Sequence, residues 1–209
     1  LDLYSKNYFE IALYNNLLTM SDLPNVLPDV PSTAQNSPMR AVSLSDYNRV
    51  LESQGKEPIS LGDNEFAVNC NSYLVEPYYH MENNQSITFN GKEYQLGIHK
   101  LLQETLSTDY SLIDSGTIVL PDSALNGLTP NKHILNVLYR QSDSDYAQGA
   151  TEAFQNSIIE NIQNNGTNNE SYGYSIIDKE GVYQSNVGTS VIVSFIAIYI
   201  GLIFLITCV

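Results

Sequence analysis

A long run without charge near the end of the chain limits the possible folds more than any other feature. Residues 187 to 209 read VGTSVIVSFIAIYIGLIFLITCV, and the last charged residue before them is Glu180. A helix rises about 1.5 Å per residue, so this run reaches roughly 35 Å, and the hydrocarbon core of a bilayer is about 30 Å thick. The sequence therefore predicts a C-terminal transmembrane helix over residues 187 to 209, attached to a domain of residues 1 to 186.

Small side chains recur on one face of this predicted helix. Ser190, Ser194, Ala197 and Gly201 follow one another at intervals of four, three and four residues. Small residues let helix backbones approach closely, so we predict that this face packs against another membrane-spanning helix of the same protein. Chance placement is the alternative, because Gly, Ala and Ser are common in such helices.

The first residues, LDLYSKNYFE, contain neither the basic nor the apolar stretch of a signal peptide. We expect an earlier membrane-spanning segment before Leu1, in a larger membrane protein. A mature chain from which a signal peptide has been removed is the alternative.

The net charge of the chain indicates which classes of binding partner are favoured. The chain has 9 Lys+Arg and 23 Asp+Glu, which gives a formal net charge of −14, and it has two cysteines, Cys70 and Cys208. Such acidity argues against a nucleic-acid partner and favours cations or basic peptides, although an ordinary solvated surface is the commoner meaning. A cysteine in the domain cannot pair with one at the far end of a membrane helix, so we expect no disulfide framework.

The rest of the chain mixes strands and helices without strict βαβ alternation. Ser43 is placed to cap a helix, and Asn90-Gly91 suits the turn of a hairpin. We expect a Pro-rich connection over residues 22–38, helices over 44–51 and 144–163, a helical turn at 121–125, and strands at 8–13, 65–68, 73–75, 87–89, 93–96, 116–120, 133–139 and 172–177. This pattern predicts an α+β fold with a mixed or antiparallel sheet and packed helices, in one domain or two subdomains.

Motifs for catalysis or metal binding are not apparent. His80, His99 and His133 are far apart and match no zinc spacing, and no nucleophile elbow or phosphate-binding loop is present. The acids at Asp143 and Asp145 lack the rest of a calcium loop and are better explained by a helix N-terminus. We therefore predict a protein without catalytic, cofactor-binding or metal-binding residues; a surface hydrolase with paired carboxylates is a more distant alternative.

Aromatic residues gather around Pro77. Tyr73, Tyr78, Tyr79 and His80 could form a platform for a ligand, since tyrosine offers a large contact area at a low entropy cost. Ordinary core or strand tyrosines are the commoner case.

Four segments, taken in order, resemble a known family. They are LSDYNRVLESQGKEPISLGDNEFAV, SITFNGKEYQLG, GTIVLPDSAL and YQSNVGTSVIVSFIAIYIGLIFLI. The order resembles the large extracellular domain of an FtsX-like (MacB-type) ABC transporter permease of Gram-positive bacteria, running into the transmembrane helix that follows it. The resemblance covers most of the chain from about Met39 onward, and no binding residue is carried over from it.

The resemblance implies a multi-pass permease in the cell membrane, with residues 1–186 extracellular. Its partners would be a separate ATP-binding subunit, other transmembrane helices of the same chain, a peptide or lipid-linked substrate and, in some members, a sensor histidine kinase. Members of the bacitracin-resistance type recognise antimicrobial peptides or their complexes with cell-wall lipid precursors. We expect a substrate- or partner-sensing domain; a membrane-anchored interaction protein, or a regulator of peptidoglycan hydrolases without transport activity, is the alternative.

Overall fold

The chain divides into two compact units. The computed structural model describes residues 5–23, 36, 38–72, 75–81, 85–106, 116–140, 144–165 and 179–207. One unit is formed by Asn7–Val137, and the other by Leu1–Lys6 together with Leu138–Val209. The boundary that the sequence suggests, between residues 186 and 187, falls inside the second unit.

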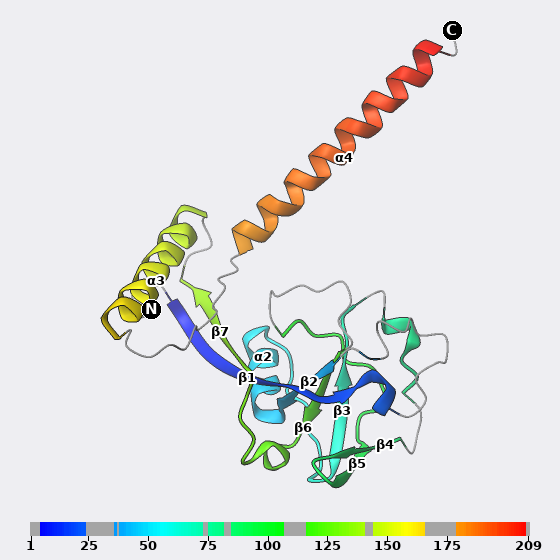
Figure 1. Cartoon of the computed structure of the whole chain (residues 1–209), viewed down its shortest axis with the longest axis vertical. Coiled ribbons are helices and arrows are strands. Elements are labelled where there is room, and N and C mark those ends of the chain that lie inside the picture. The colour runs from blue at the N-terminus through cyan, green and yellow to red at the C-terminus, as the bar shows by residue number, and fades with distance from the viewer. Residues whose placement is uncertain are drawn as a thin grey trace. The chain divides into compact units, whose positions relative to one another are not determined.

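Seven strands form one sheet across the described residues, in the order β4-β5-β3-β6-β2-β1-β7 (Figure 1). The pairs β2–β6 and β3–β5 are parallel, whereas β1–β2, β3–β6 and β4–β5 are antiparallel. The strands are β1 (Ser5–Thr19), β2 (Pro38–Ser43), β3 (Glu65–Asn69), β4 (Ser86–Phe89), β5 (Lys92–Leu96), β6 (Thr117–Leu120) and β7 (Lys132–Tyr139). The predicted α+β class with a mixed sheet is confirmed.

Both faces of the central strands are buried. Successive side chains on a strand point to opposite faces, so the consecutive apolar residues of β6 supply two core layers. Ile118 and Leu120 belong to one hydrophobic cluster together with Phe66 and Val68 of β3. Val119 belongs to the other, on the face that α2 (Leu44–Ser53) covers. The three consecutive apolar residues of β6, residues 118–120, thus fit its place in the middle of the sheet.

The helix that the sequence predicts after Ser43 is confirmed as α2. The Ser43 side chain accepts a hydrogen bond from the Asp46 backbone N–H at 3.1 Å, which satisfies one of the free donors at the helix start. Tyr47, Val50 and Leu51 recur at helical spacing and are buried against the sheet. The helix ends before Gly55, whose φ of 72° suits glycine.

The predicted hairpin around Asn90-Gly91 is also confirmed. Asn90 and Gly91 have φ angles of 49° and 76°, and they join β4 to β5. Phe89 and Tyr94, one on each strand, pack edge to face with ring centroids 6.4 Å apart. The predicted opening strand is β1, the helical turn after β6 is η3 (Asp122–Leu125), and the predicted strand over residues 133–139 is β7.

Three sequence predictions fall wholly or partly on residues outside the described ones. These are the strand at 172–177, the first two residues of the strand at 73–75, and most of the Pro-rich connection. Val75 is not in a strand; it precedes η2 (Glu76–Tyr78), which contains Pro77. Asp22, the first residue of the predicted connection, is the last residue of η1 (Met20–Asp22).

Two long helices follow β7. The predicted helix over residues 144–163 is confirmed as α3 (Ser144–Asn165). The last helix, α4, runs from Lys179 to Thr207 and so begins eight residues earlier than the predicted Val187. The predicted start followed the apolar, charge-free run, whereas the helix itself begins in the polar residues before that run.

The transmembrane part of the prediction is not confirmed. Among the described residues, none of the helices combines the length and the apolar character that crossing a membrane requires. Residues 208 and 209 of the predicted span lie outside the described residues.

Candidate functional site

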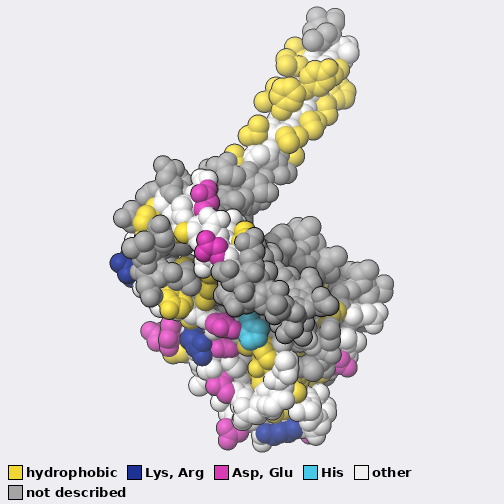
Figure 2. Space-filling view, turned by 60° about the vertical axis from the view of Figure 1, so that its left-hand side comes forward, with side chains coloured by type: hydrophobic (Ala, Val, Ile, Leu, Met, Phe, Trp, Pro, Cys, Tyr) yellow, Lys and Arg dark blue, Asp and Glu magenta, His cyan; other side chains and the backbone are white. Residues whose placement is uncertain are grey.

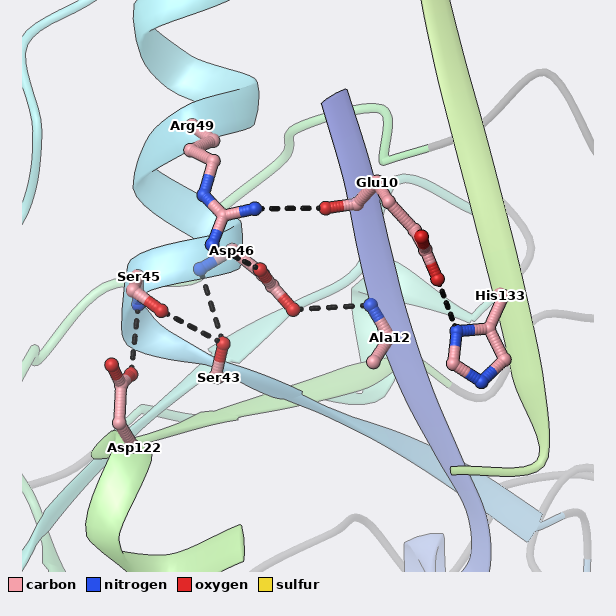
Figure 3. A network of polar contacts seen from close by, with 8 residues as sticks. All are labelled: Glu10, Ala12, Ser43, Ser45, Asp46, Arg49, Asp122 and His133. Carbon is pink, nitrogen blue, oxygen red and sulfur yellow. Dashed lines mark hydrogen bonds and ion pairs between the residues drawn. The ribbon is translucent and has the colours of Figure 1, made fainter. Parts of the chain in front are cut away.

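A network of polar contacts joins the start of α2 to strand β1 (Figure 3). Asp46, in the first turn of α2, is only 8% exposed, and its Oδ2 accepts a hydrogen bond from the Ala12 backbone N–H at 3.0 Å. Arg49 lies one turn further along, with Nη2 at 3.3 Å from Asp46 Oδ1, and its Nη1 donates to the Glu10 carbonyl at 3.0 Å. Two side chains of α2 thus bond to backbone groups of one strand.

Both ends of this network continue to other elements. The Glu10 carboxylate forms an ion pair and hydrogen bond with Nδ1 of His133 on β7 (Figure 3). Both side chains are more than half exposed, so this contact contributes little to stability. On the other side of α2, Asp122 Oδ1 accepts a hydrogen bond from the Ser45 N–H at 3.0 Å.

A second polar network lies under α2. The Tyr47 hydroxyl donates to Asn69 Oδ1 at 3.0 Å, and Asn69 in turn bonds to both the N–H and the carbonyl of Glu104. The Glu104 carboxylate pairs with Lys56. Burial, and to a lesser extent the negative charge of Glu104, raise the pKa of the Tyr47 hydroxyl above its usual value near 10. The network holds the segment that contains Glu104 against β3.

The structure also shows where the histidines and the acids considered as metal ligands lie. Within the described residues, no group of three or more His, Cys, Asp and Glu is placed to hold a metal ion. Of the three histidines, His133 pairs with Glu10, whereas His80 and His99 are exposed in other parts of the fold. Asp145 lies in the first turn of α3, as expected for acids at a helix N-terminus, and Asp143 lies outside the described residues.

The aromatic cluster around Pro77 is divided between core and surface. Tyr78 and Tyr79 are partly buried and pack against the main hydrophobic cluster, while His80 is exposed. Tyr73 lies outside the described residues. Core packing therefore accounts for Tyr78 and Tyr79 without a ligand.

The apolar surface of α4 is the most unusual feature of the described chain. Figure 2 shows hydrophobic side chains along the part of this helix that is not drawn in grey. The largest exposures belong to Phe195 at 69% and Leu205 at 66%. Other strongly exposed apolar residues are Val191, Ile192, Val193, Ile196, Ile198, Tyr199, Ile200, Leu202, Ile203 and Phe204. Successive residues on a helix turn by about 100°, so runs such as 191–193 and 202–205 point in all directions around the axis.

The predicted packing face lies on this helix. Ser190, Ser194, Ala197 and Gly201 are all exposed, and a Cβ built on Gly201 would meet no atom within 4 Å. The described residues therefore leave room for a neighbour at this face, and its packing against another helix stays a prediction.

No protein-family model matches the chain, and no curated protein sequence matches it either.

Sequence reasoning missed the network around Asp46. Asp46 was interpreted only as an acid at the start of a helix, and Glu10 and Arg49 were not considered. The i,i+3 spacing of Asp46 and Arg49 is a recognisable ion-pair signal. That both side chains would bond to β1 depends on a contact across more than thirty residues of sequence, for which the local pattern holds no signal.

Proposed function

We propose that the chain is a sensing domain attached to a membrane through α4, as part of an ABC transporter permease of the FtsX-like type. The observation that carries the proposal is the exposure of large apolar side chains around the axis of α4 between Val191 and Leu205. The resemblance of four sequence segments to the exterior domain of such permeases supports it from a separate direction.

The energetics of α4 require an apolar cover. Burying one large apolar side chain is worth roughly 1.5–3 kcal/mol, so covering a dozen of them is worth more than the whole stability of an ordinary domain. A protein partner normally covers one stripe of a helix, whereas lipid can cover every side. This exposure and the charge-free sequence of residues 187–209 support attachment of the chain to a membrane through α4.

The sensing role is assigned to the unit Asn7–Val137. Its core consists of two hydrophobic clusters, which give this unit a fold of its own. The net charge of −14 favours a cationic peptide, alone or in complex with a lipid-linked cell-wall precursor. A separate ATP-binding subunit, further transmembrane helices and a sensor histidine kinase are the partners that this proposal implies.

Flotation with lipid vesicles tests membrane attachment. The full chain is mixed with phosphatidylcholine vesicles, and the lipid-bound fraction is compared with that of a variant carrying Phe195→Asp and Leu202→Asp. A charge at the bilayer centre costs about 2.5–3.5 kcal/mol, so the double variant is expected to lose most of its binding. Leu135→Asp, at an exposed apolar position of β7, is the control and is expected to float like the original chain.

Equal flotation of the original chain and the α4 variant would contradict membrane attachment through this helix. So would an original chain that stays in the aqueous fraction.

Calorimetry of the vesicle-bound chain tests the sensing role. Cationic antimicrobial peptides are titrated with and without lipid-linked cell-wall precursors, at two salt concentrations. Micromolar or tighter binding that persists at the higher salt would support a specific site, because exposed charges alone are screened. Binding that disappears with salt, or no binding, would contradict a peptide sensor and favour the membrane-attached interaction protein.

A further inference from the structure

Strand β1 changes its neighbours along its length. From Leu13 to Thr19 it pairs with β2, which ends at Ser43 where α2 begins. Its earlier residues lie beside β7, as the contact of Glu10 with His133 and the hydrogen bond from Asn131 N–H to the Leu13 carbonyl at 3.0 Å show. Residue numbers fall along β7 as they rise along β1, so the two strands run antiparallel. We call residues 7–12 of β1 and 132–137 of β7 the outer ribbon.

On the side where β2 has ended, side chains of α2 take the place of a strand. Alternate residues of a strand present their backbone groups to the same edge, so Glu10 and Ala12 both face α2 while Ile11 faces β7. Asp46 accepts from the Ala12 N–H and Arg49 donates to the Glu10 carbonyl, each at 3.0 Å (Figure 3). One acceptor and one donor on a single helix turn thus reproduce two bonds of a sheet ladder.

Within the part of the chain that the structure describes, the outer ribbon has few apolar anchors. A two-stranded ribbon is marginally stable by itself in water. Its apolar anchors are Ile11, which is 1% exposed, and Ile134, which packs partly against the cluster under α2. Tyr8 and Leu135 are exposed at 46% and 38% and add little. The charge-assisted bonds from Asp46 and Arg49 are therefore a large part of what holds the ribbon to the domain.

We infer that Asp46 and Arg49 form a latch that holds the outer ribbon, and that the ribbon opens as one unit while the rest of the sheet stays folded. The latch is a conformational device inside the unit Asn7–Val137, and it goes beyond the proposed function without depending on it. Opening releases the edge of β1 from α2 and separates Ile134 from the cluster that contains Val119 of β6.

Hydrogen exchange of backbone amides in the full chain tests the latch. Asp46→Ala removes the acceptor of Ala12 and leaves Arg49 without its partner. A hydrogen bond to a charged group is worth about one to two powers of ten in an equilibrium, so exchange in the ribbon is expected to rise roughly 10- to 100-fold. The decisive amide is that of Ile11, which faces β7 and does not touch Asp46. Amides of β3 and β6 are expected to keep their protection.

The control is Asp122→Ala. The Asp122 carboxylate also bonds to the first turn of α2, through the Ser45 N–H, but on the side of the helix away from β1 (Figure 3). This variant is expected to leave the exchange of Ile11 unchanged. If Asp46→Ala does not fold, Asp46→Asn keeps an acceptor oxygen and removes the charge, and a smaller rise at the same amides is expected.

Two outcomes would overturn the latch. A rise confined to Ala12 would show a local hydrogen bond without cooperative opening, and an equal rise throughout residues 7–137 would show general destabilisation. Arg49→Ala and the double variant provide a further check. One latch predicts that the double variant opens the ribbon by clearly less than the product of the two single effects, whereas independent contacts predict that product.

Discussion

The helices α2 and α4 differ in what covers their apolar side chains. Both carry many apolar side chains, yet α2 buries Tyr47, Val50 and Leu51 against the sheet, whereas α4 leaves Phe195 and its neighbours exposed. The cover of α2 is supplied by the unit Asn7–Val137 itself. The cover of α4 is not found among the described residues, so we infer that it comes from lipid and from other helices.

Because of this difference, we expect substitutions on the two helices to change two different quantities: the stability of the sheet domain and its attachment to the membrane. Substitutions on α2 are expected to change the free energy of unfolding of the sheet domain. Substitutions on α4 are expected to change membrane binding and to leave that free energy almost unaltered.

The largest expected effect comes from a matched pair of Leu→Ala substitutions. Leu51 on α2 is 4% exposed, and Leu202 on α4 is 53% exposed. Leu51→Ala removes buried methyl groups and leaves a cavity, so the unfolding free energy is expected to fall by about 2–5 kcal/mol. Leu202→Ala is expected to change it by less than about 0.5 kcal/mol. Urea unfolding of the vesicle-bound chain, followed by hydrogen exchange of β3 and β6, measures both values. Similar losses would remove the contrast between the two helices.

A smaller effect is expected at the start of α2. Ser43→Ala removes the side-chain oxygen that accepts from the Asp46 N–H, and the loss of such a cap costs about 0.5–2 kcal/mol. Ser60→Ala, at an exposed position outside the helix, is the control and is expected to be neutral. The same urea unfolding measures both. An effect of Ser43→Ala no larger than that of Ser60→Ala would mean that α2 is held by packing alone.

The smallest expected effect depends on pH. The pKa of Tyr47 is raised in the folded state, so the folded chain binds the proton more tightly than the unfolded chain. The resulting stability is fully present below the unfolded pKa of about 10 and is lost as the pH rises through the higher folded value. Tyr47→Phe cannot ionise and keeps the ring. In this variant Asn69 Oδ1 still accepts from the Glu104 N–H. The free energy of unfolding at pH 8 is therefore expected to fall by about 0.5–1.5 kcal/mol.

Unfolding at pH 8 and at pH 11 checks this prediction. The free energy of the original chain is expected to fall more between the two values than that of Tyr47→Phe, with the other tyrosines common to both. A larger fall in Tyr47→Phe would reverse the sign and contradict the account.

Local signals in the sequence were enough for most elements of the sheet domain. Ser43 marked the start of α2, Asn90-Gly91 marked the hairpin, and the apolar run of β6 marked a buried strand. The order of the strands was not predictable, because the pairing of β2 with β6 joins residues more than seventy positions apart. The bonds of Asp46 and Arg49 to β1 depend on that same long-range arrangement. The start of α4 was placed too late, because the prediction began the helix at the first residue of the apolar, charge-free run.

Depth measurement on α4 tests the central claim most directly. The chain has no tryptophan, so Val191→Trp, Ile198→Trp and Leu205→Trp each give a single reporter, with Tyr8→Trp as the control on β1. Each variant is bound to vesicles that contain lipids brominated at different depths, and quenching of tryptophan fluorescence is recorded. We expect Ile198→Trp to be quenched most by bromine near the bilayer centre, the two flanking positions by shallower bromine, and Tyr8→Trp by neither. Equal shallow quenching at all three α4 positions, or none, would contradict a helix that crosses the membrane.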